Sequence, residues 1–69
     1  WTTMNSRSEE MIARYINAGC TRFEASVLEL MTRVLVARCK CDDFAEQVAQ
    51  MLESGKSYIE CANWLKAQQ

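Results

Sequence analysis

The chain has 69 residues, of which 49% are hydrophobic, and its eight basic and nine acidic side chains give a net charge of −1. This size predicts one domain over residues 1–69, and the near-neutral balance argues against a dedicated nucleic-acid binder, which is usually strongly basic. No apolar run approaches the roughly 20 residues that a membrane-spanning helix needs, so we expect no membrane partner. The start at Trp1 lacks the features of a signal peptide, as would a mature secreted chain or a domain excised from a larger protein.

A repeated local pattern predicts four helices. A good helix-capping residue is followed three positions later by Glu, so that the cap accepts from a first-turn amide and the Glu accepts from the backbone N–H of the cap. The four pairs are Ser6 with Glu9, Thr21 with Glu24, Asp43 with Glu46, and Ser57 with Glu60. Gly19 and Gly55 fall where the first and third helices should end, at a position that favours the left-handed conformation.

The first two helices are expected over residues 7–18 and 22–39. The apolar stripe of the first consists of Met11, Ile12, Tyr15 and Ile16. The second is apolar nearly all round its circumference, which is typical of the buried centre of a bundle. Its apolar residues are Phe23, Val27, Leu28, Leu30, Met31, Val34, Leu35 and Val36. We expect Phe23 to pack into the core.

The other two helices are expected over residues 43–54 and 58–67. In the third, the apolar positions follow a helical spacing of i, i+4, i+7 and i+8. They are Phe44, Val48, Met51 and Leu52. The fourth has Trp64 at the edge of one apolar face, formed by Tyr58, Ile59, Ala62 and Leu65. Since the connections are short, we predict an all-α fold, a compact four-helix bundle with antiparallel neighbours.

The cysteines, Cys20, Cys39, Cys41 and Cys61, are candidates for metal or redox chemistry. The second helix separates Cys20 from Cys39 and Cys41 by about 24 Å, whereas zinc–sulfur bonds are about 2.3 Å long, so we predict no metal site. A disulfide between Cys20 and Cys61 fits the bundle but leaves the other two cysteines unpaired. We therefore favour free thiols in a reducing compartment.

Enzymatic chemistry has little support, because the chain has no histidine and no phosphate-binding or hydrolase motif. We predict no catalytic residue, no cofactor and no small-molecule substrate. The basic residues Arg22, Arg33, Arg38 and Lys40 form a cluster that is either a solvated helix surface or a contact site for RNA or an acidic partner. Trp64 is either core or an interface anchor, since Trp is enriched at binding hot spots. The candidate partner-binding residues are Arg33, Arg38, Lys40 and Trp64.

The stretch from Ile12 to Lys66 also shows a pattern of elements known from one family. Its parts are Ala18-Gly19, Thr21-Arg22-Phe23-Glu24, Val27-Leu28-Glu29-Leu30-Met31, Asp42-Asp43-Phe44, Met51-Leu52, Tyr58-Ile59 and Trp64-Leu65. This order resembles the PWI domain, and more closely the PWI-like domains at the N-terminus of nuclear CCCH zinc-finger poly(A)-binding proteins. The resemblance implies a helical bundle that binds nucleic acid or protein in mRNA processing and export. The Pro-Trp-Ile motif and the basic segment of the family are absent, which favours protein binding.

We therefore expect a small helical protein–protein interaction module, intracellular and either nuclear or cytoplasmic, in an mRNA-processing or export factor. It would bind a protein partner or associate with itself. Two alternatives stay open. One is a secreted, disulfide-linked helical signalling or carrier protein, and the other is an RNA-binding domain that uses the basic cluster.

Overall fold

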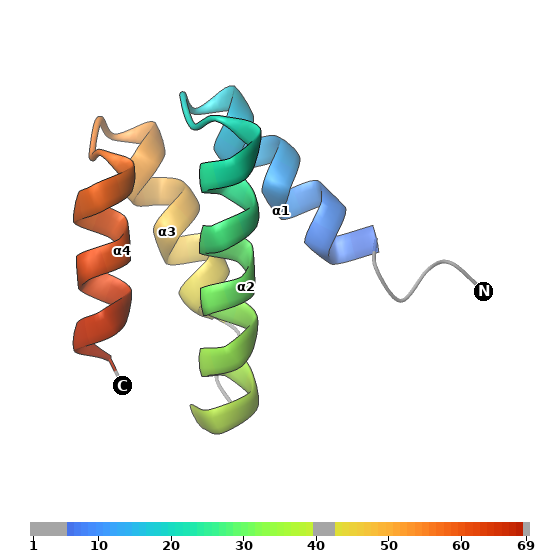
Figure 1. Ribbon diagram of the computed structural model, residues 1–69, viewed down its shortest axis with the longest axis vertical. Coiled ribbons are helices and arrows are strands. Elements are labelled where there is room, and N and C mark those ends of the chain that lie inside the picture. Colours follow the sequence, from blue (N-terminus) through green and yellow to red (C-terminus); the bar gives the residue numbers. More distant parts are fainter. Residues whose placement is uncertain (1–5, 40–42, 69) are drawn as a thin grey trace.

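Four helices make up the part of the chain described by the computed structural model, residues 6–39 and 43–68 (Figure 1). They are α1 (Ser6–Asn17), α2 (Arg22–Cys39), α3 (Asp43–Glu53) and α4 (Tyr58–Ala67). The predicted all-α four-helix bundle is confirmed. The predicted ends differ slightly, because α1 begins and ends one residue earlier than expected and α3 ends one residue earlier.

Successive helices run in opposite directions, as Figure 1 shows. Both α2 and α3 pack against all the other helices, whereas α1 and α4 do not touch each other within the described ranges. The bundle therefore has a central α2–α3 pair with α1 on one side and α4 on the other. This arrangement covers one side of α2 with three helices.

The two glycines end α1 and α3 in the way the sequence predicts. Their φ angles are +117° at Gly19 and +105° at Gly55. After α1, the N–H of Cys20 donates to the carbonyl of Tyr15 (3.0 Å) and the N–H of Gly19 donates to that of Ile16 (3.0 Å). The same pair of bonds recurs around Gly55, so both ends are Schellman motifs.

The expected caps are realised to different degrees. Thr21 and Glu24 form the full reciprocal box, with bonds of 3.0 and 3.1 Å, and the Ser57 hydroxyl accepts from the N–H of Glu60 at 3.1 Å. The expected cap at Asp43 is wrong, because Asp43 is already the first residue of α3. The side chain of Ser6, the remaining predicted cap, lies outside the described part of the structure.

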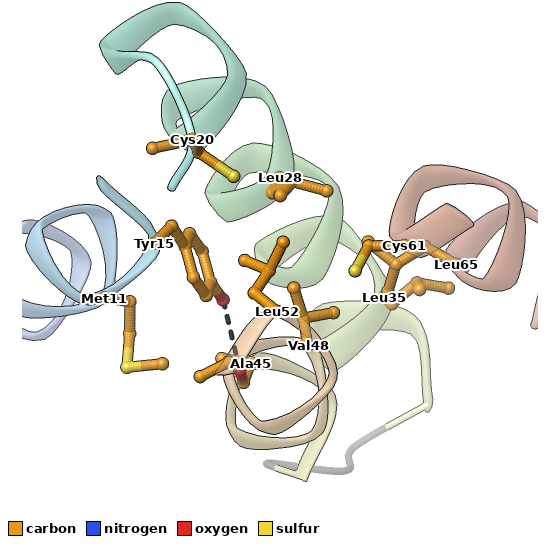
Figure 2. Packing of buried hydrophobic residues seen from close by; sticks show 12 residues of the cluster. Met11, Tyr15, Cys20, Leu28, Leu35, Ala45, Val48, Leu52, Cys61 and Leu65 are labelled. Atoms are coloured by element: carbon orange, nitrogen blue, oxygen red, sulfur yellow. Dashed lines mark hydrogen bonds between the residues drawn. The ribbon is translucent and has the colours of Figure 1, made fainter. Parts of the chain in front are cut away.

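The core lies where α1 and α4 pack against the central α2–α3 pair, and all four helices contribute to it (Figure 2). Its buried residues are Met11, Tyr15, Cys20, Ala25, Leu28, Leu35, Ala45, Val48, Ala49, Leu52, Cys61 and Leu65. The expectation that Phe23 joins this core is wrong, since Phe23 is 75% exposed, and Ile59 also lies outside it at 66%. The exposure of Phe23 has a geometric reason: three helices pack on one side of α2, so its opposite side, which carries Phe23, stays in solvent.

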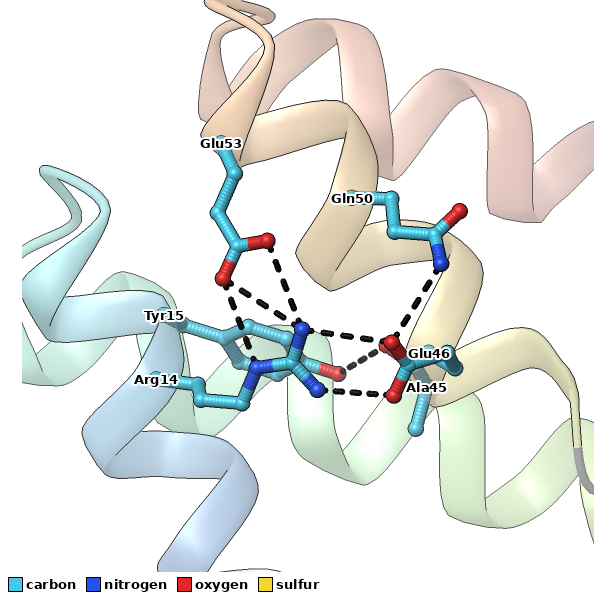
Figure 3. A network of polar contacts seen from close by, with 6 residues as sticks. All are labelled: Arg14, Tyr15, Ala45, Glu46, Gln50 and Glu53. Carbon is cyan, nitrogen blue, oxygen red and sulfur yellow. Dashed lines mark hydrogen bonds and ion pairs between the residues drawn. The ribbon is translucent and has the colours of Figure 1, made fainter.

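One guanidinium joins α1 to α3 on the surface (Figure 3). Arg14 binds both carboxylate oxygens of Glu46, at 2.7 and 3.2 Å, and pairs with Glu53 at 3.3 Å. Figure 3 also shows Gln50 donating to the Glu46 carboxylate, at 3.3 Å. Glu46 therefore serves a contact between helices rather than the capping box that its spacing from Asp43 suggests.

Candidate protein-binding surface on α2

A stripe of apolar side chains lies on the solvent side of α2. Phe23, Val27, Leu30 and Val34 recur at i, i+4, i+7 and i+11, which places them on one helix face. Phe23 is 75% exposed, Leu30 52% and Val34 46%, and Val27 is half-buried. We call these four residues the outer face of α2. They extend over about 16 Å of helix.

The outer face exists because α2 carries two apolar stripes. Ala25, Leu28 and Leu35 lie on the side that meets the other helices and are all buried. The sequence thus holds more apolar surface than a small bundle can bury around one helix. A contiguous exposed apolar patch of this kind marks an interaction site in many soluble proteins.

The charges beside the outer face are mainly positive. Arg33 follows Leu30 by three residues and Arg38 follows Val34 by four, so both lie next to it on the helix surface. Both arginines are exposed. Of the acidic residues in α2, Glu24 is held in the capping box and Glu29 is only 5% exposed. The surface therefore presents apolar groups bordered by cations.

Buried Glu29 is a finding that the sequence pattern did not suggest. Its carboxylate accepts from the Ser8 hydroxyl at 2.6 Å and pairs with Arg33 at 3.2 Å. The hydroxyl of Thr32, also buried, donates to the Glu29 carbonyl at 2.8 Å. Each charged oxygen thus has a partner, as a buried carboxylate requires. The network ties the first turn of α1 to the middle of α2.

A cavity of about 250 Å³ lies beside this network. Its polar wall includes Arg7, Ser8, Glu29 and Arg33, and its apolar wall includes Met11 and Val36. Two guanidinium groups and one carboxylate give it a net charge of +1. Because Arg33 lines the cavity and also borders the outer face of α2, the two features are neighbours.

The four residues predicted to bind a partner fall into separate places. Arg33 and Arg38 both lie on the exposed surface of α2, while Lys40 is outside the described residues. Trp64 lies on α4 and is half-buried, with its ring edge-to-face against Phe44 at a centroid distance of 5.9 Å. Trp64 also borders an open groove with Gln47, Gln50, Met51 and Ser54. Arg33 and Arg38 thus share one helix, on opposite edges of the outer face of α2, and Trp64 lies on another.

The surface residues that sequence reasoning missed are Phe23, Leu30 and Val34, which it assigned to the core, and Arg7. The signal was present: the spacing of Phe23, Leu30 and Val34 is that of a complete helix face, separate from Ala25, Leu28 and Leu35.

The described cysteines are free, with Cys20 and Cys61 buried and Cys39 exposed. Burial raises the pKa of both buried thiols, and nearby groups raise it further, Glu24 at Cys20 and chiefly Cys20 at Cys61. Such thiols stay protonated near neutral pH and are poor nucleophiles. Cys41 lies outside the described residues. Within those residues, no three His, Cys, Asp or Glu side chains gather in a way that could hold a metal ion.

A search for membrane-spanning helices and the comparisons with known proteins assign no function to the site. None of the described helices is both long enough and apolar enough to cross a bilayer. No protein-family model, no curated protein and no solved structure matches the chain. The resemblance to PWI-like domains therefore depends on the residue pattern alone.

Proposed function

We propose that this domain is a protein-binding module that receives an amphipathic helix of a partner protein on the outer face of α2. The observation that carries the proposal is the exposure of Phe23, Leu30 and Val34 along one straight helix face. A helix laid beside α2 with its own apolar residues at i, i+3, i+4 and i+7 would match that stripe. No group with perturbed reactivity suitable for catalysis accompanies it among the described residues.

The proposed setting is intracellular, in a protein of mRNA processing or export. The PWI-like pattern supports the process, and the free, buried thiols of Cys20 and Cys61 suit a reducing compartment. Arg33 and Arg38, predicted as contact residues from the sequence, border the proposed binding face. Trp64 lies on α4, where its ring contacts Phe44 of α3, so we propose that it packs against Phe44 and takes no part in this contact.

The test is a selection of helical peptides, displayed on phage, of about 16 residues, which is enough to span the outer face. Peptides that bind the immobilised domain are then titrated against Phe23→Ser, Leu30→Glu and the control Ile59→Ser. Ile59 is a matched control because it is similarly exposed but lies on α4. We expect the two α2 variants to weaken binding tenfold or more, since each removes a central apolar anchor, and the control to bind as wild type.

The proposal fails if the selected peptides bind Leu30→Glu as tightly as wild type. It also fails if no peptide is selected while a single-stranded RNA oligonucleotide binds with an affinity that falls steeply between about 50 and 200 mM salt. Circular dichroism of each variant shows whether its fold is intact, and unchanged spectra are expected because the substituted side chains are exposed.

A further inference from the structure

We infer that the partner helix places an acidic side chain in the cavity between Arg7 and Arg33, beside the outer face of α2. This inference rests on the proposed function and specifies the chemistry of the partner. The inference depends on two features that lie side by side. One is the apolar outer face of α2, which a helix can cover, and the other is the adjacent cavity, which has a net positive charge.

The position of Arg33 connects the two features. Its side chain is 59% exposed, it follows Leu30 by one helical turn, and it also lines the cavity. A helix that covers Leu30 and Val34 therefore passes directly beside Arg33. A side chain on the flank of that helix can enter the cavity, whose volume of about 250 Å³ exceeds that of one amino-acid side chain.

The hydrogen-bonding groups of the cavity select an acceptor. The Ser8 and Thr32 hydroxyls already donate to Glu29, so the donors left over are those of the guanidinium groups. Arg33 uses one of its five N–H donors on Glu29, and Arg7 forms no ion pair with another described residue. A carboxylate, which only accepts, fits these donors.

A basic guest fits less well. The one carboxylate in the cavity wall, Glu29, is 5% exposed and already has two partners. Two guanidinium groups would repel a lysine or arginine side chain from the partner. A neutral guest would leave the charge of Arg7 uncompensated in the contact, since Glu29 already pairs with Arg33. Charge complementarity therefore favours Glu or Asp at this position of the partner helix.

The probe for this inference is the same displayed library of helical peptides, in which the residue at every position is random. We expect Glu or Asp to be enriched at one fixed distance from the apolar stripe of the selected peptides. Repeating the selection on Arg7→Gln should remove that enrichment, while Lys66→Gln, an equal charge change on the exposed surface of α4, should keep it. Arg7 is used because it forms no hydrogen bond or ion pair with Glu29, whose carboxylate is bound by Ser8 and Arg33, so the buried network stays intact.

A double-mutant cycle then measures the contact directly. In a selected peptide the acid is replaced by its amide, and both peptides are titrated against wild type and Arg7→Gln. We expect each single change to weaken binding about three- to fivefold, as for a partly exposed ion pair, and the second change to add little. Peptides that need Leu30 but show neither acid enrichment nor coupling to Arg7 would overturn this inference and leave the proposed function standing. Peptides that ignore Leu30 would overturn both.

Discussion

Among single residues, Tyr15 combines a ring buried in the core with a hydroxyl that has a hydrogen-bond acceptor there. Its ring is fully buried, and its hydroxyl donates to the carbonyl of Ala45 at 3.2 Å (Figure 2). This bond joins α1 to the first turn of α3. Because the donor lies among apolar side chains, the phenol is held in its neutral form, and burial raises the pKa of Tyr15 to about 12.

Tyr15→Phe therefore tests one hydrogen bond and one titration. We expect the variant to lose about 1 kcal/mol of unfolding free energy near neutral pH, because a neutral buried hydrogen bond is removed. In wild type, the folded chain keeps the Tyr15 proton between pH 10, the ordinary pKa, and about 12, while the unfolded chain loses it. Stability from this group is thus complete below pH 10 and falls as the pH rises to 12.

The measurement is urea denaturation of both proteins at several pH values between neutrality and pH 12. The difference between wild type and Tyr15→Phe should shrink above pH 10, because the variant has no phenol to ionise at this position. A difference that stays constant over the whole range would show that Tyr15 ionises as freely in the folded chain as in the unfolded chain.

Two of the helices, α1 and α3, end at glycines, Gly19 and Gly55. Their φ angles of +117° and +105° lie where a side chain strains the backbone, and a Cβ atom at either position would meet no other atom within 4 Å. A substitution there thus isolates the backbone strain. We expect Gly19→Ala to destabilise the domain by about 1–2 kcal/mol, and Gly55→Ala to behave in the same way.

Thermal and urea denaturation of each variant measure this strain. The control is Asn17→Ala, at the last residue of α1, where the backbone is helical and alanine has the higher helix propensity. This control should keep or slightly raise the melting temperature. If Gly19→Ala were as stable as wild type, the left-handed turn would not be needed to end α1.

The helices themselves were predictable because local signals and periodicity agree. The caps at Thr21 and Ser57 and the stops at Gly19 and Gly55 determine element boundaries through contacts within a few residues, which a sequence shows directly. The exposure of Phe23 was not predictable in that way. It depends on which side of α2 the other helices occupy, and α2 has an apolar stripe on both sides.

The candidate site shows the same division between local and tertiary information. Arg33 and Arg38 were recognisable as surface cations from their residue type and place in α2. The role of Glu29 was not, because a glutamate in a helix is normally solvated. Its burial follows from Ser8, 21 residues earlier, which supplies a donor at 2.6 Å only when α1 crosses α2. Tertiary contacts of this kind bring the cavity and the outer face of α2 together.

At the scale of the whole molecule, Arg14 holds α1 against α3 from the surface. Its hydrogen bonds keep the pKa of Glu46 below the ordinary value of 4.5 and raise the pKa of Arg14 itself (Figure 3). The folded chain thus binds the Glu46 proton more weakly than the unfolded chain. The contribution of this pair is complete above pH 4.5 and is lost as the pH falls through the lower, folded-state pKa.

Arg14→Met, which keeps the apolar stem and removes the charge, is expected to lower the melting temperature at neutral pH and to make the acid transition less steep. Lys56→Met is the matched control, because Lys56 pairs with Glu60 at 3.9 Å between exposed groups and such pairs contribute little. Melting curves between pH 2 and 7 should show the Arg14→Met difference vanish at the acid end, where Glu46 is protonated in both states. A difference independent of pH would mean that Arg14 stabilises the bundle through packing rather than through its ion pairs.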